Sequence, residues 1–154
     1  MLNLDGLDAR ILLARDLAPD ATILDIASRL GVSRNTVHAR VRRMQEGGAL
    51  GPTSGRIAPA ALGRPLLAFV TLSVSQRDVD AVYLAVRDIP EVLEAHTITG
   101  NADLILRVVA RDTADLHRVT QLIQRNEGVQ RSNTSLATTE VISYRLNLML
   151  RQLE

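Results

Sequence analysis

Cysteine is absent from the 154-residue sequence, and so is lysine, since all 18 of its lysine-or-arginine positions are arginine. Without a thiol, the chain can form neither a disulfide framework nor a thiolate metal site or nucleophile. The exclusive use of arginine indicates no function by itself. Composition therefore excludes cysteine chemistry and leaves the other classes of function open.

Long apolar runs are also missing, and no segment approaches the roughly 20 residues that cross a bilayer. The opening residues, MLNLDGLDAR, carry acidic side chains where a secretory signal has basic ones. Hydrophobic residues make up 46% of the chain and charged residues 23%, as in an ordinary globular protein of one domain or two small ones. We therefore expect a cytoplasmic protein without a membrane partner.

Positive charge is concentrated in one place. The formal net charge is only +1, yet five arginines and no acidic residue lie between Ser28 and Met44. The surrounding segment, TILDIASRLGVSRNTVHARVRRMQE, predicts two short helices, because Thr22 and Ser33 suit N-caps, Gly31 suits a helix end and apolar residues recur at helical spacing. This pattern is typical of a helix-turn-helix motif.

The second helix of the motif presents a face suited to DNA. Asn35, Ala39 and Arg42 lie opposite its apolar stripe, and small or amide side chains amid positive charge fit the major groove beside phosphates. A plain solvated arginine face is the alternative. The residues predicted to contact DNA are Ser33, Arg34, Asn35, Thr36, His38, Ala39, Arg42 and Arg43.

The flanks of the motif complete a small domain. Residues 4–17 predict a further helix capped by Asp5. Arg40 lies close to the apolar stripe, so an ion pair is at least as good an interpretation as a phosphate contact; its candidate partners are Asp5, Asp8 and Glu46.

Downstream, Thr53-Ser54-Gly55 indicates a turn between two short strands, a wing or linker arm in which Arg56 could touch a phosphate.

From residue 65 onward, the spacing of apolar residues changes. Strands are predicted at 66–74, 92–99, 104–110 and 129–138, and helices at 78–89 and from residue 112 or 113. This order predicts a ferredoxin-like domain, with both helices on one face of an antiparallel sheet. The fold class is thus α+β, with a winged helix-turn-helix domain at 1–50, a linker or hinge strand at 51–64 and the ferredoxin-like domain at 65–154.

The sheet face without helices is expected to be apolar or neutral rather than charged. A face of that kind usually packs on another subunit, here most simply a second copy of the chain. The tail from Val141 to Leu150 adds apolar surface that one small sheet could not bury. We therefore expect a homodimer formed through this domain.

One loop has the composition of a ligand site: Thr99, Gly100, Asn101, Ala102 and Asp103. The last strand offers hydroxyls at Ser132, Thr134 and Thr138 on one face. If these segments meet across a subunit boundary, Asp103 would hold an ammonium group while the hydroxyls and the Gly100 amide receive a carboxylate, as in an amino-acid pocket. An ordinary hairpin and a threonine-rich strand are the alternative.

End to end, the sequence resembles the Lrp/AsnC (leucine-responsive/asparagine regulator) family of transcription factors. The resemblance is carried by LDGLDARIL, IASRLGVSRNTVHARVRRMQEGG, HTITGNADLILRV and GVQRSNTS. It implies a DNA-binding domain, a hinge strand and a sensing domain that dimerises and often assembles further, with an amino-acid effector between subunits near the glycine loop. Asn101 stands where the family commonly has an acid, and the linker GPTSGRIAPAALG is only loosely similar, so effector identity and wing geometry do not carry over.

The sequence therefore predicts a sequence-specific regulator that binds double-stranded DNA, as a homodimer, tetramer or octamer, under control of a small effector. The alternatives are a sensing module without DNA binding and an enzyme similar to tetrapyrrole decarboxylases. His38, His96 and His117 are the candidate proton carriers for the enzyme, but they show no metal-ligand spacing and no nucleophile partner. We expect no cofactor, no metal site and no catalytic residue.

Overall fold

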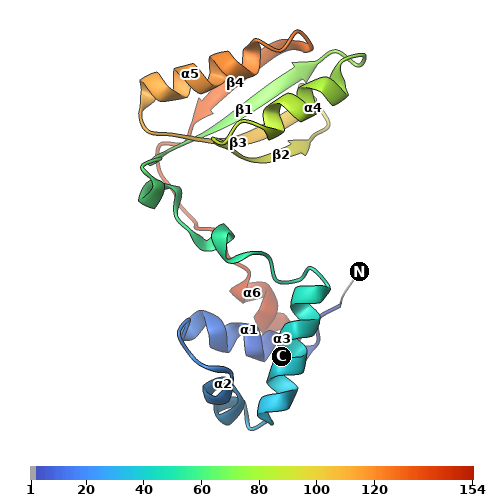
Figure 1. Ribbon diagram of the computed structural model, residues 1–154, viewed down its shortest axis with the longest axis vertical. Helices are drawn as coiled ribbons and strands as arrows, with labels where there is room; N and C mark the ends of the chain where they lie inside the picture. The colour runs from blue at the N-terminus through green and yellow to red at the C-terminus, as the bar shows by residue number, and fades with distance from the viewer. Residues whose placement is uncertain (1–2) are drawn as a thin grey trace. The chain divides into compact units, whose positions relative to one another are not determined.

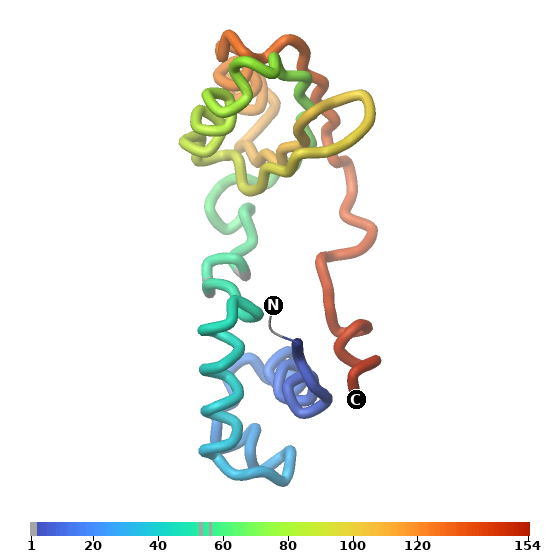
Figure 2. The backbone as a smooth tube through the Cα atoms, turned by 90° about the vertical axis from the view of Figure 1, so that its right-hand side faces the viewer, coloured from blue at the N-terminus to red at the C-terminus, as the bar shows by residue number. Residues whose placement is uncertain are grey.

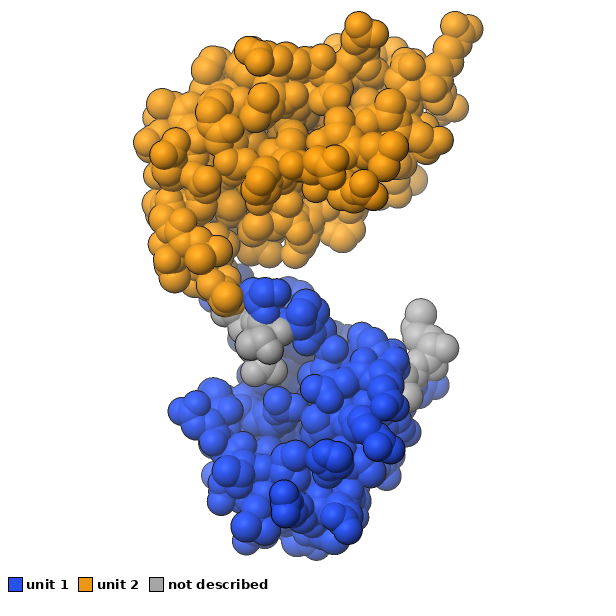
Figure 3. Space-filling view, viewed as in Figure 1, with its two compact units in different colours: residues 1–56, 142–154 blue, residues 57–141 orange. Residues whose placement is uncertain are grey.

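The structure, a computed structural model, describes residues 3–154, and of residues 53 and 56 it describes the backbone alone. It divides into two compact units, Met1–Arg56 with Ile142–Glu154, and Ile57–Val141 (Figure 3). Each unit has its own cluster of buried apolar side chains. The predicted α+β fold class is confirmed, with a helix-turn-helix in one unit and a sheet covered by helices in the other.

The first unit contains the predicted helices: α1 (Gly6–Leu17), α2 (Ile23–Leu30) and α3 (Arg34–Glu46) (Figure 1). Each begins after a predicted cap, because Asp5, Thr22 and Ser33 each accept a hydrogen bond from the backbone N–H three residues later. Gly31 ends α2 in the left-handed conformation, with φ of 67°. The helices bury a shared core that includes Ile11, Ile26, Val37 and Met44.

A carboxylate within this unit holds the helix α3 against α1. The side chain of Asp8 is fully buried and pairs with both Arg40, at 3.2 Å, and Arg43. Asp5 also pairs with Arg40. The ion-pair interpretation of Arg40 is confirmed with two of its three candidate partners, while Glu46 lies 3.6 Å from Arg42 instead.

Hydrogen bonds shift the titration of Asp5. The Arg40 side chain, followed by the backbone N–H of Asp8, lowers the pKa of Asp5 from 3.8 to about 2. Because the folded-state value is the lower one, the interaction stabilises the fold fully above pH 3.8, and the stabilisation is lost as pH falls through about 2. Asp5 is therefore an acid-sensitive support of the helix-turn-helix.

After α3 the chain forms short 3₁₀ helices, η1 (Thr53–Arg56) and η2 (Pro59–Leu62). The prediction of two wing strands around Thr53-Ser54-Gly55 is wrong, since η1 occupies that turn. Pro52 and Pro59 flank it and lack the backbone N–H that a strand pair would use. The phosphate contact suggested for Arg56 falls on a side chain outside the described residues.

The second unit has the predicted ferredoxin-like order. Its elements are β1 (Leu66–Val74), α4 (Val79–Arg87), β2 (Val92–Thr97), β3 (Leu104–Ala110), α5 (Thr113–Gln124) and β4 (Val129–Leu136). The sheet order is β2-β3-β1-β4, and every pairing is antiparallel. The strands β2 and β4 end two residues earlier than expected.

Both helices cover one face of this sheet (Figure 1). Beneath them, β1 buries Ala68, Val70 and Leu72 at alternate positions. The opposite face, which we call the open face, carries Phe69, 40% exposed. The expectation of an uncharged open face is wrong in part, because the register places the Glu94–Arg107 ion pair, 3.3 Å long, on it beside Phe69.

The end of the chain belongs to the helical unit. Here α6 (Asn147–Leu150) and the 3₁₀ helix η3 (Arg151–Leu153) contact α1 (Figures 1 and 2). The sequence-based boundaries placed these residues in the ferredoxin-like domain, whereas their contacts group them with the three helices. The C-terminal segment lies close to the start of α1, since a Cβ on Gly6 would lie 2.8 Å from the carbonyl oxygen of Leu153.

The helices formed by residues 3–154 include none with both the length and the apolar character of a membrane span.

Replacing Gly6 with alanine should release the C-terminal segment from α1. The added Cβ would meet a backbone atom, and overpacking of this kind costs typically about 1–3 kcal/mol. The amide of Leu150, which donates to the carbonyl of Leu146, should exchange with solvent about tenfold faster or more, as measured by NMR. Gly51→Ala is the control, because a Cβ there meets nothing within 4 Å; equal exchange in both variants would contradict this packing.

Acid should weaken the helical unit through Asp5. The free energy of unfolding, followed by urea titration of the NMR signals of α1 and α3, should fall between about pH 4 and pH 2 in the wild type. Asp5→Asn should remove much of that slope because it abolishes the titrating group. Asp16→Asn, at an exposed position of α1, should keep the slope; indistinguishable slopes in the two variants would show that Asp5 is not the sensor.

Candidate DNA-binding surface and ligand loop

The predicted DNA-contacting residues form an exposed ridge on α3, which we call the α3 ridge. Thr36 is half-buried and the other seven members are exposed: Ser33, Arg34, Asn35, His38, Ala39, Arg42 and Arg43. The opposite side of the helix is fixed, because Val37, Val41 and Met44 are buried in the core. The helix thus offers its polar side to solvent from a rigid base.

The arginines of α3 divide into two groups. Arg40 and Arg43 are tied to Asp8 of α1, so part of their charge serves the packing of the helix. Arg34 keeps an exposed side chain, and Arg42 has only the exposed contact with Glu46. A surface pair of that kind contributes little and exchanges readily for a phosphate or base. Arg40 and Arg43 therefore serve the packing of α3, whereas Arg34 and Arg42 lie on its exposed side.

Sequence reasoning did not single out Asp8 as a buried residue. Two signals pointed toward it: the spacing of Asp5 and Asp8, which forms a reciprocal capping box, and the position of Arg40 near the apolar stripe. Burial itself depends on how α1 and α3 cross.

The glycine loop follows β2 and is held by backbone contacts. Gly100 has φ of 114°, a conformation that favours glycine, and a Cβ there would meet nothing within 4 Å. Asp103 donates its N–H to the carbonyl of Leu72, and one of its carboxylate oxygens accepts from the N–H of Val74 at 2.8 Å. Part of the Asp103 carboxylate therefore ties the loop to β1.

The last strand meets the loop through a residue that sequence reasoning missed. Arg131 donates to the backbone oxygen of Asn101 at 2.9 Å. Ser132 and Thr134 share the helix-covered side, since they pair in register with Leu72 and Val70, and Ser132 contacts Gln124 of α5. Thr138 lies past the end of β4. Within one chain, the loop and the three hydroxyls are thus not gathered into one pocket.

An open cleft of about 680 Å³ lies between α4 and the edge strand β2. Its lining mixes an apolar floor with Tyr83, Arg87, Glu94 and His96. A smaller hollow of about 220 Å³ shares Tyr83 and reaches Ile98 and Asp103. Sequence reasoning missed both hollows, because their walls come from segments that only the fold brings together.

The histidines do not form a catalytic cluster. His38 lies on α3, His117 is exposed on α5, and His96 on β2 lies 3.7 Å from Glu94. Across the described part of the chain, no three histidine, aspartate or glutamate side chains are grouped as metal ligands.

Known families match both units. The family model of the Lrp/AsnC ligand binding domain matches residues 67–146, and that of a winged helix-turn-helix DNA-binding domain matches residues 4–50. Among curated relatives, the HTH-type transcriptional regulator AldR of Mycolicibacterium smegmatis is 36% identical over 140 residues, covering 87% of this chain and 81% of that protein. Regulatory protein AsnC of Haemophilus influenzae is 33% identical over 141 residues, covering 89% and 93%.

Solved structures agree over nearly the whole chain. AsnC of E. coli superposes with a TM-score of 0.84 at 25% identity, covering 95% of this chain and 99% of that one. A feast or famine regulatory protein from M. tuberculosis, complexed with L-methionine, gives 0.81 at 27% identity, covering 93% and 97%. With its helix-turn-helix and its ligand-binding domain both matched, the chain belongs to the Lrp/AsnC family of transcriptional regulators.

Proposed function

We propose that this protein is a cytoplasmic regulator that reads specific DNA sequences through the α3 ridge, changes its DNA affinity or assembly when an amino acid binds, and catalyses no reaction. The observation that carries the proposal is the ridge: it combines capped helix geometry, exposed arginine and amide side chains, and a buried back that is braced against α1. A helix of this form fits the major groove of B-DNA.

Different residues of the α3 ridge are suited to phosphate contacts and to base contacts. Ser33, Arg34 and Thr36 lie at the positive end of the helix dipole, where hydroxyls and a guanidinium suit phosphate oxygens. Asn35 and Arg42 have the side chains that make bidentate contacts with adenine and guanine, respectively. Ala39 leaves room for the helix to approach the bases. In a dimer, two such helices would read half-sites about 34 Å apart, or a multiple of that spacing.

The open face of the sheet supports a homodimer. Phe69, although 40% exposed in the single chain, lies at the centre of the sheet on β1, between β3 and β4. Exposed aromatic surface on a central strand favours burial against a second copy, and the nearby Glu94–Arg107 pair supplies polar contacts at its side. Further assembly into a tetramer or octamer would follow from additional contacts between such dimers.

The amino-acid effector is supported by relatives and by the loop. A related protein of Neisseria meningitidis and one of M. tuberculosis are described as complexes with L-methionine. Here the residues proposed to hold the effector are Thr99, Gly100, Asn101, Ala102 and Asp103, with Ser132, Thr134 and Thr138 supplied by a neighbouring subunit. The adjoining hollow at Tyr83 and Ile98 has room for an effector side chain. Binding there would alter subunit packing and thereby the spacing of the two α3 helices.

Alanine substitutions on α3 should separate base contacts from phosphate contacts. Asn35→Ala and Arg42→Ala should each weaken binding to the cognate site by about 1–3 kcal/mol while changing binding to unrelated DNA much less. The measurement is fluorescence anisotropy on DNA from upstream of the protein's own gene, repeated with a panel of amino acids. Arg125→Ala, exposed at the end of α5, is the control. Equal losses on all sequences would reassign the residue to phosphate contact, and no loss would remove it from the interface.

A charge on the open face should prevent dimerisation. Phe69→Glu places a carboxylate in the proposed interface, so sedimentation velocity at micromolar concentration should shift from dimer or larger to monomer. The matched control is Leu84→Glu, because Leu84 is 54% exposed on α4, on the covered side of the sheet. A monomeric wild type, or a Phe69→Glu variant that sediments like the wild type, would refute this interface.

A further inference from the structure

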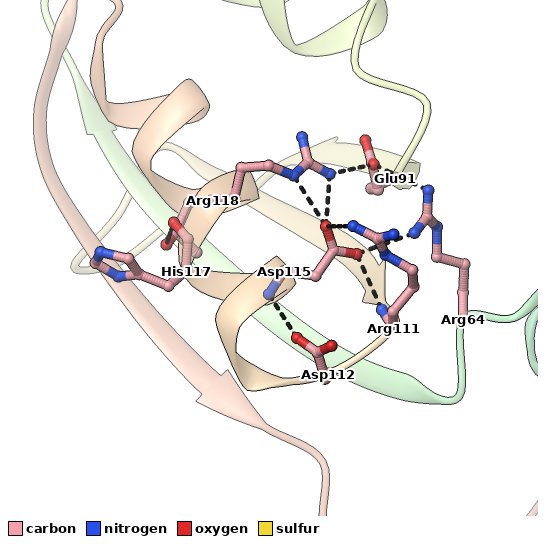
Figure 4. Close-up of polar contacts among 8 residues, drawn as sticks. Arg64, Glu91, Arg111, Asp112, Asp115, His117 and Arg118 are labelled. Atoms are coloured by element: carbon pink, nitrogen blue, oxygen red, sulfur yellow. Dashed lines mark hydrogen bonds and ion pairs between the residues drawn. The ribbon is translucent and has the colours of Figure 1, made fainter.

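Five charged side chains meet at the start of the sheet domain, and we call them the Arg64 network: Arg64, Glu91, Arg111, Asp115 and Arg118 (Figure 4). They come from separate parts of the second unit. Arg64 immediately precedes β1, Glu91 lies between α4 and β2, Arg111 lies between β3 and α5, and the other two lie on α5. The network therefore joins the linker to the body of the domain.

Two carboxylates at its centre are withdrawn from solvent. Glu91 is 6% exposed and Asp115 is 4% exposed. A buried carboxylate is costly unless it is paired and hydrogen-bonded, and removing one partner of a buried pair is strongly destabilising. Asp115 satisfies this requirement with the backbone N–H of Arg111 at 3.0 Å and the Nε of Arg118 at 2.9 Å.

These contacts keep Asp115 ionised. The backbone and side chain of Arg111, with a further contribution from Arg118, hold the pKa of Asp115 well below its usual range. The Asp115 charge therefore persists throughout the physiological pH range. Its own N–H is bonded to Asp112, the cap of α5, at 2.8 Å, which fixes the start of the helix on which the carboxylate stands.

Arg64 joins both buried carboxylates with one guanidinium. One terminal nitrogen lies 3.0 Å from Asp115 and the other lies 3.3 Å from Glu91. Because the guanidinium is planar and its two donors are held apart, this bridge fixes the orientation of the Arg64 side chain. A lysine ammonium is a single point of charge and could not reproduce the two-sided contact.

The backbone around Arg64 is itself restricted. The 3₁₀ helix η2 starts at Pro59, Gly63 follows it with φ of 72°, and Pro65 restricts both its own backbone and that of Arg64. Arg64 also donates its N–H to the carbonyl of Pro59 at 3.0 Å. Residues 59–65, which we call the linker arm, thus form a short structured segment with its charged anchor at the end nearest β1.

We propose that Arg64 is a positioning residue that fastens the linker arm to the sensing domain through Glu91 and Asp115. The arm then moves as one body with the β3–α5 turn, and its direction of exit from the sheet is set by the network. To the extent that the arm conveys the effector response, this inference rests on the proposed function. The fastening itself requires neither DNA nor effector.

The chain contains no cysteine, so spin labels can be placed without background. One label replaces Leu62, 70% exposed on η2, and the other replaces the exposed Arg125 at the end of α5, as Leu62→Cys and Arg125→Cys. Both lie in the second unit. Doubly labelled chain is mixed with a large excess of unlabelled chain, so that labels on neighbouring subunits do not contribute distances. Double electron–electron resonance on the full chain should then give one narrow distance distribution, and Arg64→Ala should widen it at least twofold.

Arg111→Ala is the matched control, since it removes an arginine that contacts Asp115 without removing a contact of Arg64. Its distance distribution should stay narrow. Arg64→Lys keeps the charge and should give a distance distribution of intermediate width. If circular dichroism shows that Arg64→Ala fails to fold, the width measured for Arg64→Lys tests whether Arg64 fastens the linker arm. A distribution in the Arg64 variants as narrow as in Arg111→Ala would overturn the proposal.

A second measurement separates this inference from the proposed function. In anisotropy assays, Arg64→Ala should retain effector-free DNA affinity within about twofold and lose most of the change that the active amino acid causes in the wild type. An unchanged effector response would overturn the coupling role of the arm. If the wild type itself binds no DNA, the proposed function fails, while the distance measurement still decides whether Arg64 fastens the arm.

Discussion

The orientation of the α3 ridge depends on one interaction, the pairing of the buried Asp8 carboxylate with two arginines. Fully withdrawn from solvent on α1, it is neutralised by Arg40 and Arg43 of α3. Because an unpaired charge at that position would be costly, the pairing allows few relative placements of the two helices. Burial of the apolar stripe of Val37, Val41 and Met44 stabilises the packing of α3, and the ion pairs with Asp8 fix the orientation of α3 relative to α1. Together they determine which side of α3 faces solvent.

The sheet domain uses the same device in a different place. Asp115 and Glu91 are nearly buried, and arginines from the linker, the β3–α5 turn and α5 neutralise them. In both units, a carboxylate in the first turn of a helix anchors arginine from another segment; the Asp8 carboxylate also belongs to the cap of α1, whereas Asp115 takes part in the cap of α5 through its backbone N–H. A chain whose lysine-or-arginine positions are all arginine suits this arrangement, because one guanidinium can contact two acceptors at once.

Much of the fold could be predicted from the sequence because its signals are local. The caps at Asp5, Thr22 and Ser33, the left-handed Gly31 and the spacing of apolar residues specify the helix-turn-helix within a few residues of each feature. The order of strands and helices in the sheet domain is readable in the same way, since each element carries its own periodicity. The exposure of the α3 ridge followed from that periodicity too.

The remaining features depend on contacts between distant segments. Burial of Asp8 arises from the crossing of α1 and α3, and the network around Asp115 requires four segments of the folded domain. The C-terminal residues pack on α1, a pairing across more than 130 positions of sequence that periodicity does not encode. Replacement of the wing strands by η1 reflects the flanking prolines, whose missing donors weigh more than the turn composition between them.

We propose that the α3 ridge reads DNA sequence and does not simply carry charge. The most direct measurement compares the affinity of the full-length protein for its own upstream DNA and for a scrambled duplex of equal length across a salt titration. The account predicts at least a roughly 10³-fold preference for the upstream DNA, with log affinity falling linearly with log salt for both duplexes. Equal affinity for the two duplexes, or no binding to either at low salt, would contradict it.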